Sequence, residues 1–115
     1  MVILYGIANC DTVKKARAWL TERGIEYQFH DFRKQGVNPV QLRAWLDEFG
    51  WETLVNRKGT TWRKLPEETR QAMDATLALA VMEDQPSLIK RPILDNGQRR
   101  LVGFDPDSYR QLFQH

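Results

Sequence analysis

The chain has 115 residues and a single cysteine, Cys10, which is the side chain best suited to covalent chemistry. A lone cysteine is more often a small buried apolar residue than a nucleophile, so its surroundings decide between these interpretations. Cys10 follows a short apolar run, Val2 to Tyr5, and a loop that begins at Gly6. It stands at the first turn of the helix predicted next, where unpaired backbone N–H groups and the helix dipole favour a thiolate over a thiol. The position therefore favours a reactive sulfur.

Basic residues occur in two groups that could assist an anionic sulfur, whereas Asp11, next to Cys10, opposes it. The groups are Arg57, Lys58, Arg63 and Lys64, and then Lys90, Arg91, Arg99 and Arg100, with Asp95 the only acid near the second group. The alternative interpretation is that these side chains are simply solvated, as most runs of charge are.

Arg91 stands apart because it directly precedes Pro92 at the start of a predicted strand. With a cysteine at the start of the first helix, this is where we expect a cis X-Pro bond, which leaves the adjacent backbone able to pair with an extended thiol substrate. Arg91 and Pro92 are therefore predicted site residues.

The sequence argues against several other kinds of chemistry. One cysteine forms no internal disulfide and no cysteine-based zinc site, and His30 and His115 are too few to replace one. No phosphate-binding glycine motif and no Ser/His/Asp set occurs. We expect no metal and no bound cofactor, with His30 structural.

The single cysteine indicates a cytoplasmic protein, and charge and hydropathy argue against membrane and nucleic-acid partners. Lys and Arg number 17 against 15 Asp and Glu, a net charge of +2, which is too small for a dedicated nucleic-acid or membrane-surface binder. The longest apolar run, from Leu77 to Met82, is far shorter than a membrane span, and the apolar start of the chain has no basic region and ends at Gly6, unlike a signal peptide.

The first part of the chain is typical of a strand, a helix and a parallel strand. The predicted helix carries its apolar residues at helical spacing and stops at Gly24; they are Val13, Ala16, Trp19 and Leu20. Residues 26–31 are rich in aromatic side chains with partial alternation, which predicts the second strand.

Helices are predicted for the middle of the chain. Asn38 and Pro39 begin a helix whose apolar stripe ends at Gly50. Residues 51–65 have weak periodicity, and a further helical region is predicted from Pro66 until shortly before Pro86.

The last part predicts a hairpin and a closing helix. Strands on either side of Asn96–Gly97 are predicted to be joined by a type I′ turn, in which both turn residues have positive φ. Asp105 and Pro106 then start a helix whose apolar stripe includes Tyr109. The whole order predicts one α/β domain over residues 1–115, a thioredoxin-like fold with a helical insertion and a four-stranded mixed sheet.

Three separated segments give the chain its resemblance to the arsenate reductase ArsC/Spx family, closest to the short YffB-like branch. They are Tyr5-Gly-Ile-Ala-Asn-Cys10-Asp-Thr-Val-Lys-Lys-Ala, then Val55-Asn-Arg57-Lys-Gly-Thr, then Leu88-Ile-Lys-Arg91-Pro92-Ile. They occur in the family's order and span nearly the whole chain. The resemblance implies a nucleophilic thiolate at Cys10, anion-binding arginines at Arg57 and Arg91, and glutathione as co-substrate.

The chain departs from the family pattern at two positions. In arsenate reductases of this type a third arginine follows the hairpin strand, and Gly103 stands there, with Arg99 and Arg100 a few residues earlier. Arg100 or Arg99 is then the third anion-binding candidate. We expect the protein to have negligible arsenate reductase activity. Gly103→Arg should gain some of this activity if the backbone there tolerates a side chain. In Spx-type regulators a second cysteine follows three residues on, where this chain has Val13.

These observations predict a monomeric, glutathione-dependent thiol reductase, with a thiol, disulfide or oxyanion as substrate and glutaredoxin as a further partner. Two alternatives stay open at this stage. One is an arsenate reductase, and the other is a non-catalytic regulator that binds RNA polymerase as Spx does.

Overall fold

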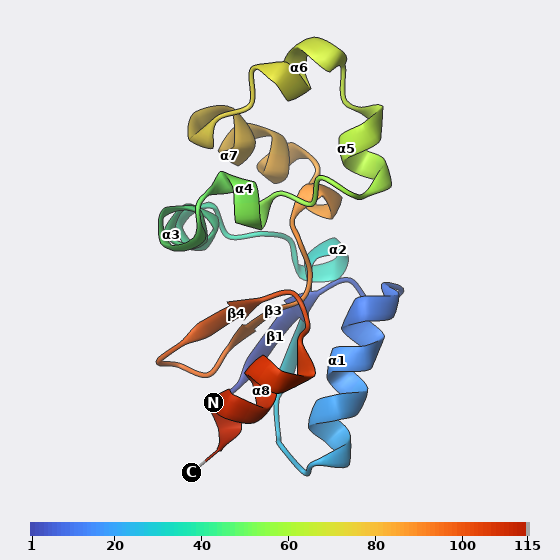
Figure 1. Cartoon of the computed structure of the whole chain (residues 1–115), viewed down its shortest axis with the longest axis vertical. Helices are drawn as coiled ribbons and strands as arrows, with labels where there is room; N and C mark the ends of the chain where they lie inside the picture. The colour runs from blue at the N-terminus through green and yellow to red at the C-terminus, as the bar shows by residue number, and fades with distance from the viewer. Residues whose placement is uncertain (115) are drawn as a thin grey trace. The chain divides into compact units, whose positions relative to one another are not determined.

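The computed structural model describes residues 1–114, which form two compact units (Figure 1). The first unit contains Met1–Gln35 and the described residues from Arg91 onwards, and the second contains Gly36–Lys90. One family domain over the whole chain stays a prediction, and His115 lies outside the described residues. In the described part, no helix combines the length and the apolar character that crossing a membrane requires.

The first unit is built on a mixed four-stranded sheet, as predicted. Its strands are β1 (Ile3–Gly6), β2 (Gln28–Asp31), β3 (Ile93–Asp95) and β4 (Arg100–Val102), in the order β2-β1-β3-β4. β2 runs parallel to β1, whereas β3 pairs antiparallel with both β1 and β4. β2 starts at Gln28, two residues later than predicted.

Two helices, α1 (Asp11–Glu22) and α8 (Pro106–Phe113), pack on one face of this sheet. Leu4 and Leu94 are paired across β1 and β3, so their side chains lie on the same face. The predicted apolar stripe of α1 is fully confirmed, because its buried residues are Val13, Ala16, Trp19 and Leu20. Tyr109 of α8 is 0% exposed and completes this core. A short helix, α2 (Phe32–Gln35), follows β2.

The second unit is helical. It contains α3 (Pro39–Phe49), α4 (Trp51–Leu54), α5 (Thr60–Lys64), α6 (Glu67–Gln71), α7 (Ala75–Asp84) and the 3₁₀ turn η1 (Pro86–Leu88). The start of α3 is as predicted, since the Asn38 side chain accepts hydrogen bonds from the Val40 and Gln41 N–H groups. The helical region predicted from Pro66 is broken, however, because the Asp74 carboxylate accepts from Leu77 N–H at 2.8 Å and starts α7 as a new helix.

The β3–β4 hairpin forms, but the predicted type I′ turn is wrong. That turn needs positive φ at Asn96 and Gly97, and only Gly97 has it, at 94°. The Asn96 side chain instead accepts hydrogen bonds from the N–H groups of Gln98 and Arg99, at 2.9 and 2.7 Å. The connection is therefore a four-residue loop, organised by an asparagine side chain.

The Tyr109 hydroxyl is buried in the core without a hydrogen-bond partner in the described part of the chain. Its ring packs edge-on against Phe104 at 4.8 Å and Trp19 at 5.5 Å between centroids. Burial raises the pKa of the Tyr109 phenol well above its ordinary value. The ring thus stabilises the core while the hydroxyl costs free energy.

We therefore expect Tyr109→Phe to raise the free energy of unfolding at pH 7 by roughly 1 kcal/mol, and Tyr109→Ala to lower it by roughly 3–5 kcal/mol. Above pH of about 10, an unfolded tyrosine ionises while buried Tyr109 stays neutral, so the wild type loses stability as pH rises. The advantage of Tyr109→Phe should widen over that range. Urea titrations from pH 7 to 11 measure both effects, and a Phe variant that is less stable at every pH contradicts this account.

Candidate functional site

Cys10 occupies the N-cap position of α1, at the end of the loop that leaves β1. Its backbone is extended, with φ −98° and ψ 126°, and its C=O accepts the Lys14 N–H at 2.9 Å, the first hydrogen bond of the helix. The Cys10 side chain makes no cap hydrogen bond and is partly exposed. The sulfur thus lies at the N-terminus of α1, where the helix dipole favours a thiolate, and its partial exposure leaves it open to a substrate.

The loop before Cys10 is fixed at both ends. Ile7 is 3% exposed and anchors its start, and the Cys10 N–H donates to the Ile7 C=O at 3.2 Å. Gly6 allows α1 to lie close to β1, because a Cβ at this position would stand 2.8 Å from the Val13 side chain. Sequence reasoning did not assign this role to Gly6, since the close approach depends on tertiary packing.

The sheet brings Arg91 and Pro92 to the same end as Cys10. Tyr5 pairs with Ile93, so continuing this antiparallel register places Pro92 opposite Gly6, where the Cys10 loop begins. The Arg91–Pro92 peptide bond is cis, in agreement with the expectation from sequence. Arg91 is partly buried, including its Nε atom.

Arg100, the third predicted anion-binding residue, lies at the opposite end of the sheet. Arg100 pairs with Asp95, and Asp95 pairs with Ile3 at the start of β1. Its guanidinium lies 3.9 Å from the Asp95 carboxylate. Arg99 is in the hairpin loop, still further along. The sheet register does not bring either arginine to the Cys10 end, and the anion-binding role of Arg100 stays a prediction.

Arg57 belongs to the second unit, in the segment after α4. Its side chain is exposed, donates weakly to the Glu52 C=O at 3.5 Å and lies over the Trp51 ring at 5.5 Å. These contacts explain how α4 positions Arg57. Its anion-binding role stays a prediction.

Asp31 is the only buried charged residue in the described part, at 6% exposure, and its register partner is Gly6. This places a carboxylate near the Cys10 end of the sheet, which sequence reasoning missed. The Asp31 carboxylate accepts the Arg33 N–H at 2.9 Å, as a cap of α2. Its burial is therefore explained by local structure.

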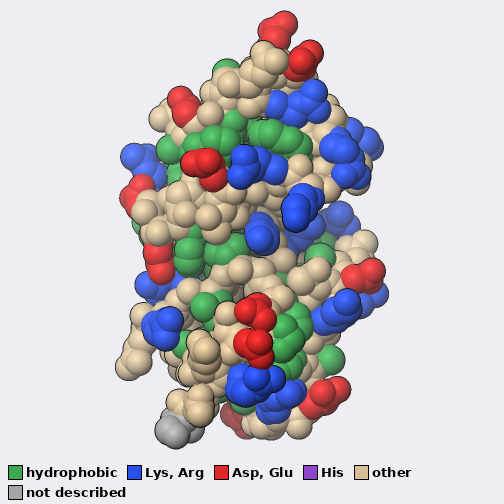
Figure 2. Space-filling model, viewed as in Figure 1, with side chains coloured by type: hydrophobic (Ala, Val, Ile, Leu, Met, Phe, Trp, Pro, Cys, Tyr) green, Lys and Arg blue, Asp and Glu red, His purple; other side chains and the backbone are tan. Residues whose placement is uncertain are grey.

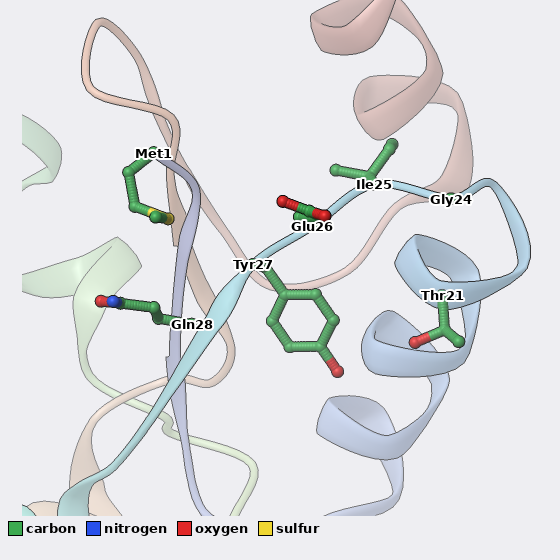
Figure 3. A pocket seen from close by; sticks show the side chains of 7 residues that line it. All are labelled: Met1, Thr21, Gly24, Ile25, Glu26, Tyr27 and Gln28. Atoms are coloured by element: carbon green, nitrogen blue, oxygen red, sulfur yellow. The ribbon is translucent and has the colours of Figure 1, made fainter.

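A hollow at the other end of α1 lies away from this chemistry (Figure 3). Residues from Gly24 to Gln28 form much of its lining, with Met1 and Thr21. Glu26 is the only charged side chain in the lining, which contains no Cys, His, Lys or Arg. Among the described residues, no group of acidic, histidine and cysteine side chains could hold a metal ion.

Comparisons with known proteins decide the family. The sequence profile of the ArsC family matches residues 5–112. The chain belongs to the ArsC family. A solved structure described as "YFFB (PA3664) protein" is 50% identical, covers 96% of this chain and 97% of its own, and superposes with a TM-score of 0.92.

The other proteins to which the chain is similar include an arsenate reductase-related protein, a transcriptional regulator and a glutaredoxin. An arsenate reductase (ArsC) related protein from Brucella melitensis is 48% identical over 99% of this chain and 95% of its own, with a TM-score of 0.80. The global transcriptional regulator Spx of Enterococcus faecalis is 30% identical over 97% of this chain and 86% of its own length. A glutaredoxin from Archaeoglobus fulgidus, 15% identical over 99% of this chain and 86% of its own with a TM-score of 0.50, shares the thioredoxin-like fold.

Gly103 lies opposite Pro92, to whose C=O its N–H donates at 2.8 Å. This backbone position is at the Cys10 end of the sheet, but φ is 82° and the residue is buried. A side chain is strained there, which corrects the expectation that Gly103→Arg could gain arsenate reduction.

We expect Gly103→Arg and Gly103→Ala each to lower the free energy of unfolding by at least roughly 1–2 kcal/mol, the cost of left-handed backbone for an L-residue. Neither variant should gain arsenate-dependent oxidation of glutathione. Urea denaturation and an assay coupled through glutaredoxin measure the two effects. An active, fully stable Gly103→Arg would show that a third cation can be placed from this position.

Proposed function

We propose that the protein is a glutathione-dependent thiol reductase with Cys10 as its single nucleophile. The observation that carries this proposal is the position of Cys10: an uncapped, partly exposed thiol at the N-terminus of α1, at the sheet end that also holds Arg91 and cis Pro92. Membership of the ArsC family, with arsenate reductase-related neighbours, supports oxidoreductase chemistry.

The reaction begins when the Cys10 thiolate attacks a sulfur of a disulfide. A bond forms between the two sulfurs, the substrate S–S bond breaks, and the departing sulfur leaves as a thiolate that takes up a proton. When the attacked sulfur belongs to glutathione, Cys10 carries a glutathionyl group. A second glutathione thiolate then attacks that group, which releases glutathione disulfide and restores the Cys10 thiolate. The net change is that one glutathionyl mixed disulfide is reduced to its free thiol while one free glutathione thiol is consumed and one glutathione disulfide is released.

The resolving thiol comes from outside the chain because Cys10 is its only cysteine. The position three residues later is Val13, which is 0% exposed and packs inside the protein. The two-cysteine switch of Spx-type regulators is therefore absent. Glutaredoxin is a second proposed external thiol, and we propose that the reductase acts as a cytoplasmic monomer.

Arg91 and Arg57 are the proposed anion-binding residues. A guanidinium offers paired N–H donors that match a carboxylate, and glutathione carries two carboxylates. The backbone beside Pro92 is the proposed pairing site for the extended thiol peptide. Two arginines suit a carboxylate better than arsenate, whose several charged oxygens are repelled by a nearby thiolate.

Glutathione disulfide should convert the wild type to a single Cys10 adduct, and Cys10→Ser should abolish both the adduct and reductase turnover. The serine hydroxyl is not ionised at neutral pH and forms no disulfide. Intact-protein mass spectrometry measures the adduct, and unfolding curves confirm that the variant folds. A wild-type protein that stays unmodified would sink the proposal and leave the alternative of a regulator, which the Spx relative supports.

Arg91→Gln should slow adduct formation with glutathione disulfide by roughly tenfold, because a charge-assisted hydrogen bond to a carboxylate is lost. The rate with uncharged 2-hydroxyethyl disulfide should change much less. Arg100→Gln is the matched control, since Arg100 lies at the other end of the sheet. Equal slowing with both disulfides would mean that Arg91 supports the backbone at Pro92 and does not bind the substrate.

A further inference from the structure

The second unit has a surface hollow of about 310 Å³ that is lined by three cations, Arg57, Lys58 and Lys90. Glu52 is the only acidic residue in the lining, so the charged side chains sum to +2. Figure 2 shows other Lys and Arg side chains gathered over α5 of the same unit. The lining of the hollow therefore carries a net positive charge.

The floor of the hollow is held by backbone hydrogen bonds between two distant segments. The Asn56 N–H donates to the Leu88 C=O, and the Lys90 N–H donates to the Leu54 C=O, each at 2.8 Å. Val55 and Ile89, both almost fully buried, form a β-bridge between the same segments. Lys90 is therefore fixed across from the segment that carries Lys58, although 31 intervening residues separate them in sequence.

Neither lysine has an ion-pair partner in the described part of the chain. Arg57 is directed to the end of α4, where it donates to the Glu52 C=O and lies over the Trp51 ring. The Lys58 N–H donates to the Asn56 side chain at 3.3 Å, which fixes the turn but leaves its ammonium group in solvent. The hollow is thus lined by two exposed lysines and by an arginine whose guanidinium is oriented by Glu52 and Trp51.

We propose that Lys58 and Lys90, together with Arg57, bind a small ligand with two or more negative charges. Ammonium groups pair with carboxylate or phosphate oxygens as point charges, so the class of ligand is set by charge and by size rather than by a fixed fork geometry. The negative charge of Glu52 reduces the attraction of the hollow for anions. This inference rests on the proposed function only for the anion-binding role of Arg57. The anion-binding roles of Lys58 and Lys90 are proposed only here.

The test uses Cys10→Ser as background, so that no thiol chemistry contributes. Inorganic phosphate and succinate are titrated separately by calorimetry and by following the indole N–H resonance of Trp51, which Trp51→Phe identifies. We expect saturable binding of at least one probe, weakened roughly two- to fivefold by Lys58→Gln or Lys90→Gln and strengthened similarly by Glu52→Gln. Added salt should weaken it. The preferred probe tells a phosphate ligand from a carboxylate ligand.

Lys64→Gln is the matched control, because Lys64 is an exposed lysine of the same unit outside the hollow lining. The Lys64→Gln variant should bind each probe with the same affinity as the Cys10→Ser background protein. The proposal is overturned if neither phosphate nor succinate binds saturably. It is also overturned if Lys64→Gln weakens binding as much as Lys58→Gln or Lys90→Gln does, because the attraction would then be diffuse. Circular dichroism confirms that each variant folds. Formation of the Cys10 adduct is measured separately, so failure here is distinguishable from failure of the reductase.

Discussion

β1 lies inside the sheet, hydrogen-bonded to β2 on one side and β3 on the other, and this pairing decides which groups of the first unit share an end with Cys10. The loop to Cys10 leaves from Gly6, whose neighbours in the register are Asp31 and Pro92. The hairpin loop lies at the opposite end of the same strands. Arg100 is only eight residues after Pro92 in the sequence, and yet it lies at the opposite end of the sheet.

Local patterns predicted the elements well because their causes are local. Asn38 and Asp105 cap helices through their own side chains, and the apolar spacing of α1 predicted its buried face residue by residue. The break at Asp74 was missed because apolar residues continue at nearly helical spacing across it. At Asn96, a side chain that bonds to the loop backbone replaced the tight turn suggested by the Asn-Gly pair.

The site was predictable only where a residue's role follows from its own element. The position of Cys10 at a helix start and the cis bond before Pro92 at a strand start could be predicted because both kinds of start can be recognised in sequence. The places of Gly6, Asp31 and Gly103 depend on contacts between strands and helices, and so does the place of Arg100 at the other end of the sheet. The positive φ of Gly103 also needed the fold, since glycine occurs at ordinary backbone angles too.

The chemistry follows from one sulfur and few cations. In the proposed reaction, the mixed disulfide at Cys10 is resolved by an external thiol because the chain has no second cysteine, and position 13 is a buried valine. At the Cys10 end of the sheet, Arg91 is the arginine that the register supplies. This arrangement suits a carboxylate-bearing thiol more than an oxyanion that carries charge on several sides.

The most direct test of the central claim is the steady-state rate of disulfide reduction as glutathione and a glutathionylated peptide are varied together. A single cysteine that forms a covalent intermediate and is then released by an external thiol predicts ping-pong kinetics, seen as parallel lines in double-reciprocal plots. Intersecting lines would show that both substrates must bind before any bond changes. That result, or no turnover at all, would contradict the proposed function.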